Sequence, residues 1–237
     1  MITPAELQQN IEKVQNRIKA VAEKAGRSVD ELKIVAVGKT HPAETFLPAI
    51  EAGQIHFGES RIQEAADKIP ALESHNLVWH LIGHLQRNKA GDAIELFDEF
   101  HALDSNRLAR RLQNQMEKSE RKSFPVFIQV NTSGEESKYG IDPEALQEML
   151  DLIGEKCPHL RVKGLMTVAP WTDDEKVLHA TFANLRKLQE QYKSYNAPNI
   201  HLENLSMGMT NDFEIAIEEG ATHLRIGRAI FGTRRSR

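Results

Sequence analysis

Residues 32–37, with the sequence LKIVAV, are followed at once by the tripeptide Gly-Lys-Thr at positions 38–40. The run is short, apolar and rich in β-branched residues, as is typical of a buried strand. Residues 42–53 then have a helical pattern that starts with Pro42 and stops at Gly53. A strand followed by a helix is the unit from which parallel sheets are built, so this stretch predicts the first βα unit of an α/β protein.

The same alternation of short apolar runs and longer helical patterns continues along the chain. The expected strands are residues 32–37, 55–58, 77–82, 100–103, 125–130, 160–168, 201–206 and 223–226. The helices expected between them are residues 42–53, 60–68, 88–96, 106–118, 143–154, 173–192 and 211–219. Eight such strands favour a closed (β/α)8 TIM barrel over an open doubly wound sheet.

One extra helix is expected before the first strand. Thr3 can cap it, Pro4 takes its first position, and Gly26 is a plausible stop. Its apolar residues Leu7, Ile11, Val14 and Ile18 follow helical spacing. No linker or low-complexity block divides the rest of the chain, and 237 residues are close to the ~250 of one barrel. We therefore expect a single domain over residues 1–237.

Composition narrows the possible classes of function. The net charge of -4 argues against a general attraction to nucleic acid. The N-terminus lacks the apolar core of a signal peptide, and no apolar run reaches the ~18 residues of a membrane span. Cys157 is the only cysteine, so no disulfide can form within the chain. These features predict a cytoplasmic protein that binds neither nucleic acid nor membrane.

Lys39 stands where such a barrel carries its chemistry, directly after the C-terminal end of a strand. Burial there disfavours the ammonium form, and a neutral amine is what Schiff-base formation needs. A surface lysine at the barrel mouth is the alternative, and position alone leaves both open. A phosphate-binding P-loop is rejected, because position 33, where that motif needs glycine, is Lys33.

The ends of the last two strands predict an anion site. Ser206 offers a hydroxyl, and Gly208 and Gly227 allow backbone N–H groups to approach a ligand closely. Asn211 and Glu214 have the spacing of a helix cap, which places a helix N-terminus beside the same loop. The loops after strands seven and eight often bind phosphate in these barrels. The alternative is that the glycines only make tight turns.

Arg225 lies between Leu224 and Ile226, so alternation along a strand points it away from both. A buried arginine needs a partner. We expect either a structural ion pair or a donor to the ring nitrogen of a cofactor.

His80 and His84 have the spacing of a helical zinc pair but lie in a segment with strand character. On a strand, residues with this spacing are ~13 Å apart, so the pair favours no metal site. A histidine at the barrel mouth that packs on a ring is the preferred interpretation.

Several short segments, in order along nearly the whole chain, together carry a family resemblance. They are VAVGKT at 35–40, FGE at 57–59, QE at 63–64, WHLIG at 79–83, LQ at 85–86, NK at 88–89, GLM at 164–166, LSMGM at 205–209, RIG at 225–227 and AIFG at 229–232. This set resembles the pyridoxal phosphate homeostasis proteins, the YggS/PROSC family. The resemblance implies a barrel related to the N-terminal domain of alanine racemase.

The resemblance also implies pyridoxal 5′-phosphate (PLP) bound as an internal aldimine on Lys39. It implies phosphate contacts from Ser206 and from the backbone at Gly227 and Arg228, with Arg225 near the pyridine nitrogen. Two positions depart from the family pattern. Ser60 stands where many members have Asn, and Arg228 stands where a small residue, often Thr, is common.

Two functions remain after the resemblance is taken into account. A racemase-like enzyme needs acid–base groups on both faces of its substrate, and the racemases supply the second from a tyrosine in a further C-terminal domain. This sequence stops at Arg237, and Tyr139, Tyr192 and Tyr195 do not match that tyrosine. We therefore expect a monomeric, reversible PLP carrier or regulator without catalytic residues or substrate turnover. It would deliver PLP transiently to apo-enzymes, and the racemase-like enzyme is the alternative.

Overall fold

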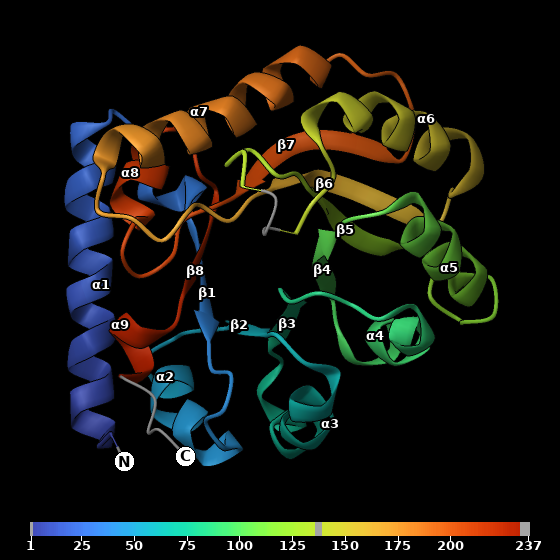
Figure 1. Ribbon diagram of the computed structural model, residues 1–237. Helices are drawn as coiled ribbons and strands as arrows, with labels where there is room; N and C mark the ends of the chain where they lie inside the picture. The colour runs from blue at the N-terminus through green and yellow to red at the C-terminus, as the bar shows by residue number, and fades with distance from the viewer. Residues whose placement is uncertain (1, 136–138, 233–237) are drawn as a thin grey trace.

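The protein folds as a closed barrel of eight parallel strands, as the computed structural model of residues 2–135 and 139–232 shows (Figure 1). Each strand lies beside the next in chain order, and β8 returns to pair with β1. The strands are β1 Lys33–Val37, β2 His56–Glu59, β3 Val78–Leu81, β4 Glu99–Leu103, β5 Phe124–Gln129, β6 Leu160–Met166, β7 Ile200–Ser206 and β8 His223–Ile226. The predicted fold class is confirmed.

Helices surround the barrel on its outer face (Figure 1). Within the described residues the α-helices are α1 Pro4–Lys24, α2 Leu47–Glu51, α3 Ile62–Ala71, α4 Ala90–Leu96, α5 Asn106–Met116, α6 Leu146–Lys156, α7 Glu175–Tyr192, α8 Phe213–Glu218 and α9 Arg228–Phe231. Short 3₁₀ helices cover Val29–Glu31, Ala43–Phe46, Glu73–His75, Arg87–Lys89 and Pro143–Ala145. None of the described helices has both the length and the apolar character needed to cross a membrane.

Helix α1 confirms the extra leading helix. Thr3 caps it, its side chain and that of Glu6 form a reciprocal capping box, and Pro4 takes the first position. The helix packs along α8 and α9 (Figure 1). Arg17 forms a bidentate ion pair with Glu214, with both N–O distances at 2.9 Å.

Two helix predictions need correction, and one helix was missed. Residues 42–53 form a 3₁₀ helix followed by the short α2, because Pro48 has no N–H to continue a single ladder. The predicted cap at Asn211 is wrong: α8 follows Asp212, whose carboxylate accepts a hydrogen bond from the Met209 amide instead. Helix α9 was not predicted at all, because its four residues are too few to show a periodic pattern.

The barrel interior is polar below the C-terminal ends of the strands, a region called its lower part from here on. His80, His101 and His223 are buried there on β3, β4 and β8. Burial lowers the pKa of His101 to about 3, so its imidazole is neutral at physiological pH. Layers of branched aliphatic side chains usually fill a barrel of this kind, so packing alone does not account for the three histidines.

Candidate functional site

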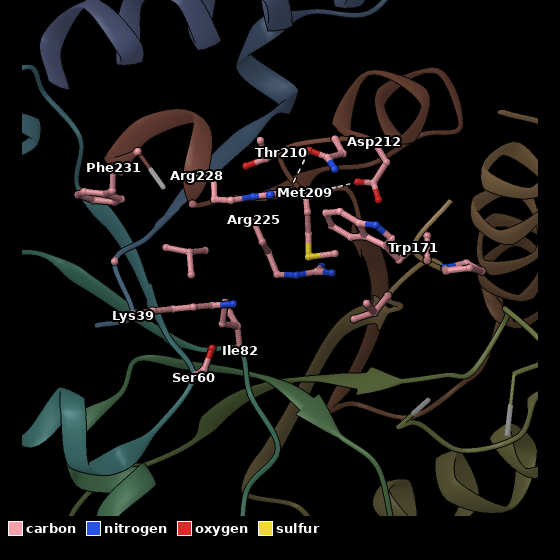
Figure 2. Close-up of a pocket in the computed structure, with 18 of the residues that line it drawn as sticks. Lys39, Ser60, Ile82, Trp171, Met209, Thr210, Asp212, Arg225, Arg228 and Phe231 are labelled. Carbon is pink, nitrogen blue, oxygen red and sulfur yellow. Dashed lines mark hydrogen bonds between the residues drawn. The ribbon is translucent and has the colours of Figure 1, made fainter. Parts of the chain in front are cut away.

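A cavity of about 670 Å³ lies at the C-terminal end of the barrel, where β1, β6, β7 and β8 end. This is the face on which such barrels build their binding sites. The volume is within the range of small-molecule pockets. Figure 2 shows Lys39 and Arg225 extending into the cavity from β1 and β8. Ser60 and Ile82 line the side nearest Lys39.

Lys39 has a left-handed backbone, with φ of 38°. This conformation is uncommon for a residue with a side chain and persists only where the surroundings hold it. The Lys68 ammonium donates a hydrogen bond to the Lys39 carbonyl oxygen. Helix α3 therefore holds the backbone of Lys39, the lysine that lines the cavity among the described residues.

Lys68 itself is fixed by a buried ion pair with Glu59 at the end of β2, with an N–O distance of 2.6 Å. Both side chains are at least nine-tenths buried. Burial raises the pKa of Glu59 to about 7, although the hydrogen bond and charge of Lys68 oppose the shift. The pair is a structural support for Lys39 that sequence reasoning missed, because it joins two elements across the barrel rim.

Arg225 lies at the floor of the cavity. Its guanidinium donates to the Thr167 carbonyl and to Ser206 Oγ, each at 2.8 Å. Burial lowers the pKa of Arg225 to about 10, and the charge of Asp212 opposes this, so the group remains cationic at neutral pH. The guanidinium forms no ion pair with any described residue, so its charge is aimed at the cavity rather than at a structural partner.

Ser206 and Gly208 do not line the cavity. Ser206 is completely buried below it, where Oγ lies 2.8 Å from His101 Nδ1 and accepts the Arg225 bond. Gly208 has φ of +90°, and a Cβ there would lie 2.6 Å from the Ala216 side chain. Its role is to turn the chain tightly against α8, which was the alternative left open for the glycines.

Thr210, in the same loop as Ser206, does line the cavity, and the sequence prediction missed it. Its Oγ accepts a 3.3 Å hydrogen bond from the Ala229 amide, which joins the loop after β7 to the start of α9. A second hydroxyl in the same loop as Ser206 was the available signal. Only the path of the loop decides which of the two reaches the cavity.

Gly227 and Arg228 line the cavity beside Thr210. A Cβ at Gly227 would lie 3.2 Å from the Val37 carbonyl oxygen, so glycine lets β8 end close against β1. The Arg228 guanidinium lies 5.0 Å from the centre of the Trp171 ring and donates to Asn211. These contacts place a second cation at the rim, at the position that departs from the family pattern.

His80 and His84 are not a zinc pair. His84 hydrogen-bonds to Asp104 at 2.9 Å and stacks on the ring of Tyr139, with centroids 4.9 Å apart. His80 instead faces His56 and His101 inside the barrel. Neither histidine lines the cavity. A lysine amine that faces a buried arginine across a cavity of this size is typical of a β/α barrel that binds a small molecule.

Comparison with known proteins identifies the family to which the chain belongs. Residues 3–235 match the family described as alanine racemase, N-terminal domain. The chain is 42% identical over 232 residues to a protein of Vibrio cholerae named pyridoxal phosphate homeostasis protein, and the match covers 96% of each. The chain therefore belongs to the alanine racemase N-terminal domain family and, within it, to the pyridoxal phosphate homeostasis proteins.

Solved structures agree with this placement. A Bifidobacterium adolescentis protein of unknown function superposes with a TM-score of 0.91 at 33% identity, over 97% of each chain. PipY of Synechococcus elongatus, solved with PLP bound, superposes with a TM-score of 0.79 at 35% identity, over 91% of this chain and 100% of PipY. Alanine racemase of Clostridium difficile shares the fold, with a TM-score of 0.75 at 15% identity, and this chain spans 57% of it.

Proposed function

We propose that the protein binds pyridoxal 5′-phosphate in the cavity as a Schiff base on Lys39 and serves as a reversible PLP reservoir in cofactor homeostasis. The observation that carries the proposal is the placement of the Lys39 side chain opposite the Arg225 guanidinium across a cavity of about 670 Å³. The structure solved with PLP bound to PipY, a relative at 35% identity, supports it.

The phosphate group would lie between the loop after β7 and the start of α9. Thr210 offers a hydroxyl there, and Gly227 allows the backbone to approach an anion closely. Arg228 adds a positive charge at the rim. In this proposal Thr210 takes the role first expected of Ser206, whose hydroxyl is occupied by Arg225 and His101.

The pyridine ring would lie between Lys39 and Arg225. Arg225 would hold the ring nitrogen by a hydrogen bond, and its positive charge would disfavour protonation of that nitrogen. A protonated ring is the better electron sink, so this arrangement weakens the ring in that role. The racemases share the arginine, so the second acid–base group is the stronger criterion. Ser206 and the Thr167 carbonyl fix the guanidinium in place by hydrogen bonds.

The position of the tyrosines supports a carrier over a racemase-like enzyme. Racemisation needs a second acid–base group opposite the lysine. None of Tyr139, Tyr192 and Tyr195 lines the cavity. Tyr139 stacks on His84, and Tyr195 donates to Asp151 at 2.7 Å. We propose that the protein acts without substrate turnover.

Reduction by borohydride tests the covalent site. The purified protein is incubated with PLP, reduced and digested, and the peptides are weighed by mass spectrometry. We expect one reduced adduct, on the peptide that contains Lys39. Lys19→Ala, which changes an exposed lysine on α1, is the control and should keep the adduct. A protein that gains no adduct, or gains it elsewhere with Lys39 intact, would overturn the proposal.

The carrier role requires release as well as binding. When the PLP-loaded protein is mixed with an apo-aminotransferase, it should restore the activity of that enzyme, and it should racemise no amino acid at enzymatic rates.

We also propose that the protein works as a monomer in the cytoplasm, where its single buried cysteine, Cys157, stays reduced. Sedimentation equilibrium measures the mass of the particle and checks the monomer.

A further inference from the structure

A second cluster of functional groups lies inside the barrel, below the cavity, and reaches from the middle of the strands to the start of β4. Sheet register places Glu99 at the start of β4 beside His80 on β3, and His101 follows on the same face of β4. His80 Nδ1 and His101 Nε2 lie 3.0 Å apart. Glu99 Oε2 lies 3.3 Å from the first and 3.5 Å from the second.

These separations have the dimensions of a metal site. Bonds of 2.0–2.1 Å at tetrahedral angles set ligand atoms about 3.3–3.4 Å apart. Two imidazole nitrogens and one carboxylate oxygen are a common catalytic or open zinc ligand set, with the fourth position left for water. Calcium prefers oxygen ligands at longer distances, so the set selects a first-row transition ion such as Zn²⁺.

In each histidine, the outer ring nitrogen, which is the one that points away from Glu99, already has a hydrogen-bond partner. His80 Nε2 lies 3.0 Å from His56 Nδ1, and His101 Nδ1 lies 2.8 Å from Ser206 Oγ. Metal-binding histidines are usually oriented in this way, by a hydrogen bond through the nitrogen that does not bind the metal. The contacts leave both inner nitrogens facing the Glu99 carboxylate.

The Glu99 carboxylate supplies an independent indication of a missing partner. Its Oε2 atom is buried and accepts no hydrogen bond from a described residue. An unpaired carboxylate oxygen at a buried position is costly unless a cation or a donor satisfies it. The Glu99 side chain is 15% exposed, so one edge of the cluster touches solvent at the start of β4.

We propose that His80, Glu99 and His101 bind one Zn²⁺-like divalent ion in the lower part of the barrel. In the metal-free protein one of the two inner nitrogens carries a proton that bridges them. When the ion binds, this proton leaves the inner nitrogen and the outer nitrogen of the same ring takes one up, so both imidazoles stay neutral. Through Ser206, the bound ion is connected by hydrogen bonds to Arg225 in the cavity above. The site is formed entirely by residues outside that cavity.

Cobalt titration tests this site without PLP. Chelator-treated protein is titrated with Co²⁺ and followed by its visible d–d absorption. We expect saturation at one ion per chain, with the intense bands of four-coordinate Co²⁺, and loss of the bands when Zn²⁺ is added. Weak bands of six-coordinate Co²⁺ only, or no saturation at one equivalent, would overturn the proposal.

Two variants locate the ion. Glu99→Gln keeps the shape of the side chain and should weaken Co²⁺ binding by more than about 10-fold, since even partners outside the ligand set are worth about 10–100-fold. His179→Gln is the matched control, because His179 faces Glu218 and Glu219 on the surface. It should bind Co²⁺ as the unmodified protein does. Unchanged binding in Glu99→Gln, or loss in His179→Gln, would place the ion elsewhere.

The melting temperature of the unmodified protein, measured with and without Zn²⁺, tests the site even if a variant fails to fold. An ion that binds only the folded state stabilises it in proportion to the logarithm of its concentration over Kd. Zn²⁺ should therefore raise the melting temperature of the unmodified protein and of His179→Gln. A melting temperature that does not respond to Zn²⁺ in the unmodified protein would contradict a site in the folded barrel.

Discussion

Thr210 presents its hydroxyl to the cavity at the point where we place the phosphate group. Thr210→Val keeps the shape and removes the donor. A hydrogen bond to a charged group contributes about 1.5–3 kcal/mol, so the Kd for PLP should rise roughly 10- to 150-fold. Fluorescence titration with PLP measures it. Thr181→Val, which changes a buried hydroxyl bonded within α7, should leave Kd unchanged. Equal affinity in both variants would contradict the assignment of Thr210.

Lys68 supports Lys39 from below the cavity rim. Lys68→Met leaves the Glu59 carboxyl buried without its partner, and breaking a buried pair costs about 3–5 kcal/mol. Urea denaturation should show this loss in the free energy of unfolding. The double variant Glu59→Leu/Lys68→Met removes both charges and should recover much of it. If the single variant unfolds like the unmodified protein, the pair does not support the fold.

At the scale of elements, the same pair joins β2 to α3 and makes stability depend on pH. The folded-state pKa of Glu59, about 7, lies above its ordinary value of 4.5, so the folded state holds the proton more tightly. This contribution is fully present below pH 4.5 and is lost as pH rises through 7. Denaturation at a series of pH values should show a falling contribution in the unmodified protein that Glu59→Gln lacks. Parallel curves would contradict the raised pKa.

The turn from β7 into α8 depends on Gly208, which has both a positive φ and no room for a side chain. Gly208→Ala should cost about 1–2 kcal/mol for the backbone and a further ~1–3 kcal/mol for the overlap with Ala216. Gly26→Ala is the matched control, because φ is +69° and nothing lies within 4 Å of its Cβ position. Thermal unfolding of both variants separates the two costs. Equal losses would show that the close approach is unimportant.

At the scale of the whole molecule, local patterns in the sequence predicted the barrel and the position of Lys39. Alternation of apolar runs and helical periods depends only on neighbouring residues, and Lys39 directly follows such a run. The choice between Ser206 and Thr210 depends on how a loop crosses the barrel mouth, which no local pattern encodes. The same holds for the contacts of His101 with His80 and Ser206, which lie 21 and 105 positions away in the sequence.

The central claim is that this barrel holds PLP on Lys39. Absorbance spectra of the unmodified protein and of Lys39→Ala, each titrated with PLP, test it most directly. We predict that the unmodified protein develops the yellow band of a lysine Schiff base, saturating at one PLP per chain, and that Lys39→Ala does not. The same band at full occupancy in Lys39→Ala, or a colourless unmodified protein with excess PLP, would contradict the account.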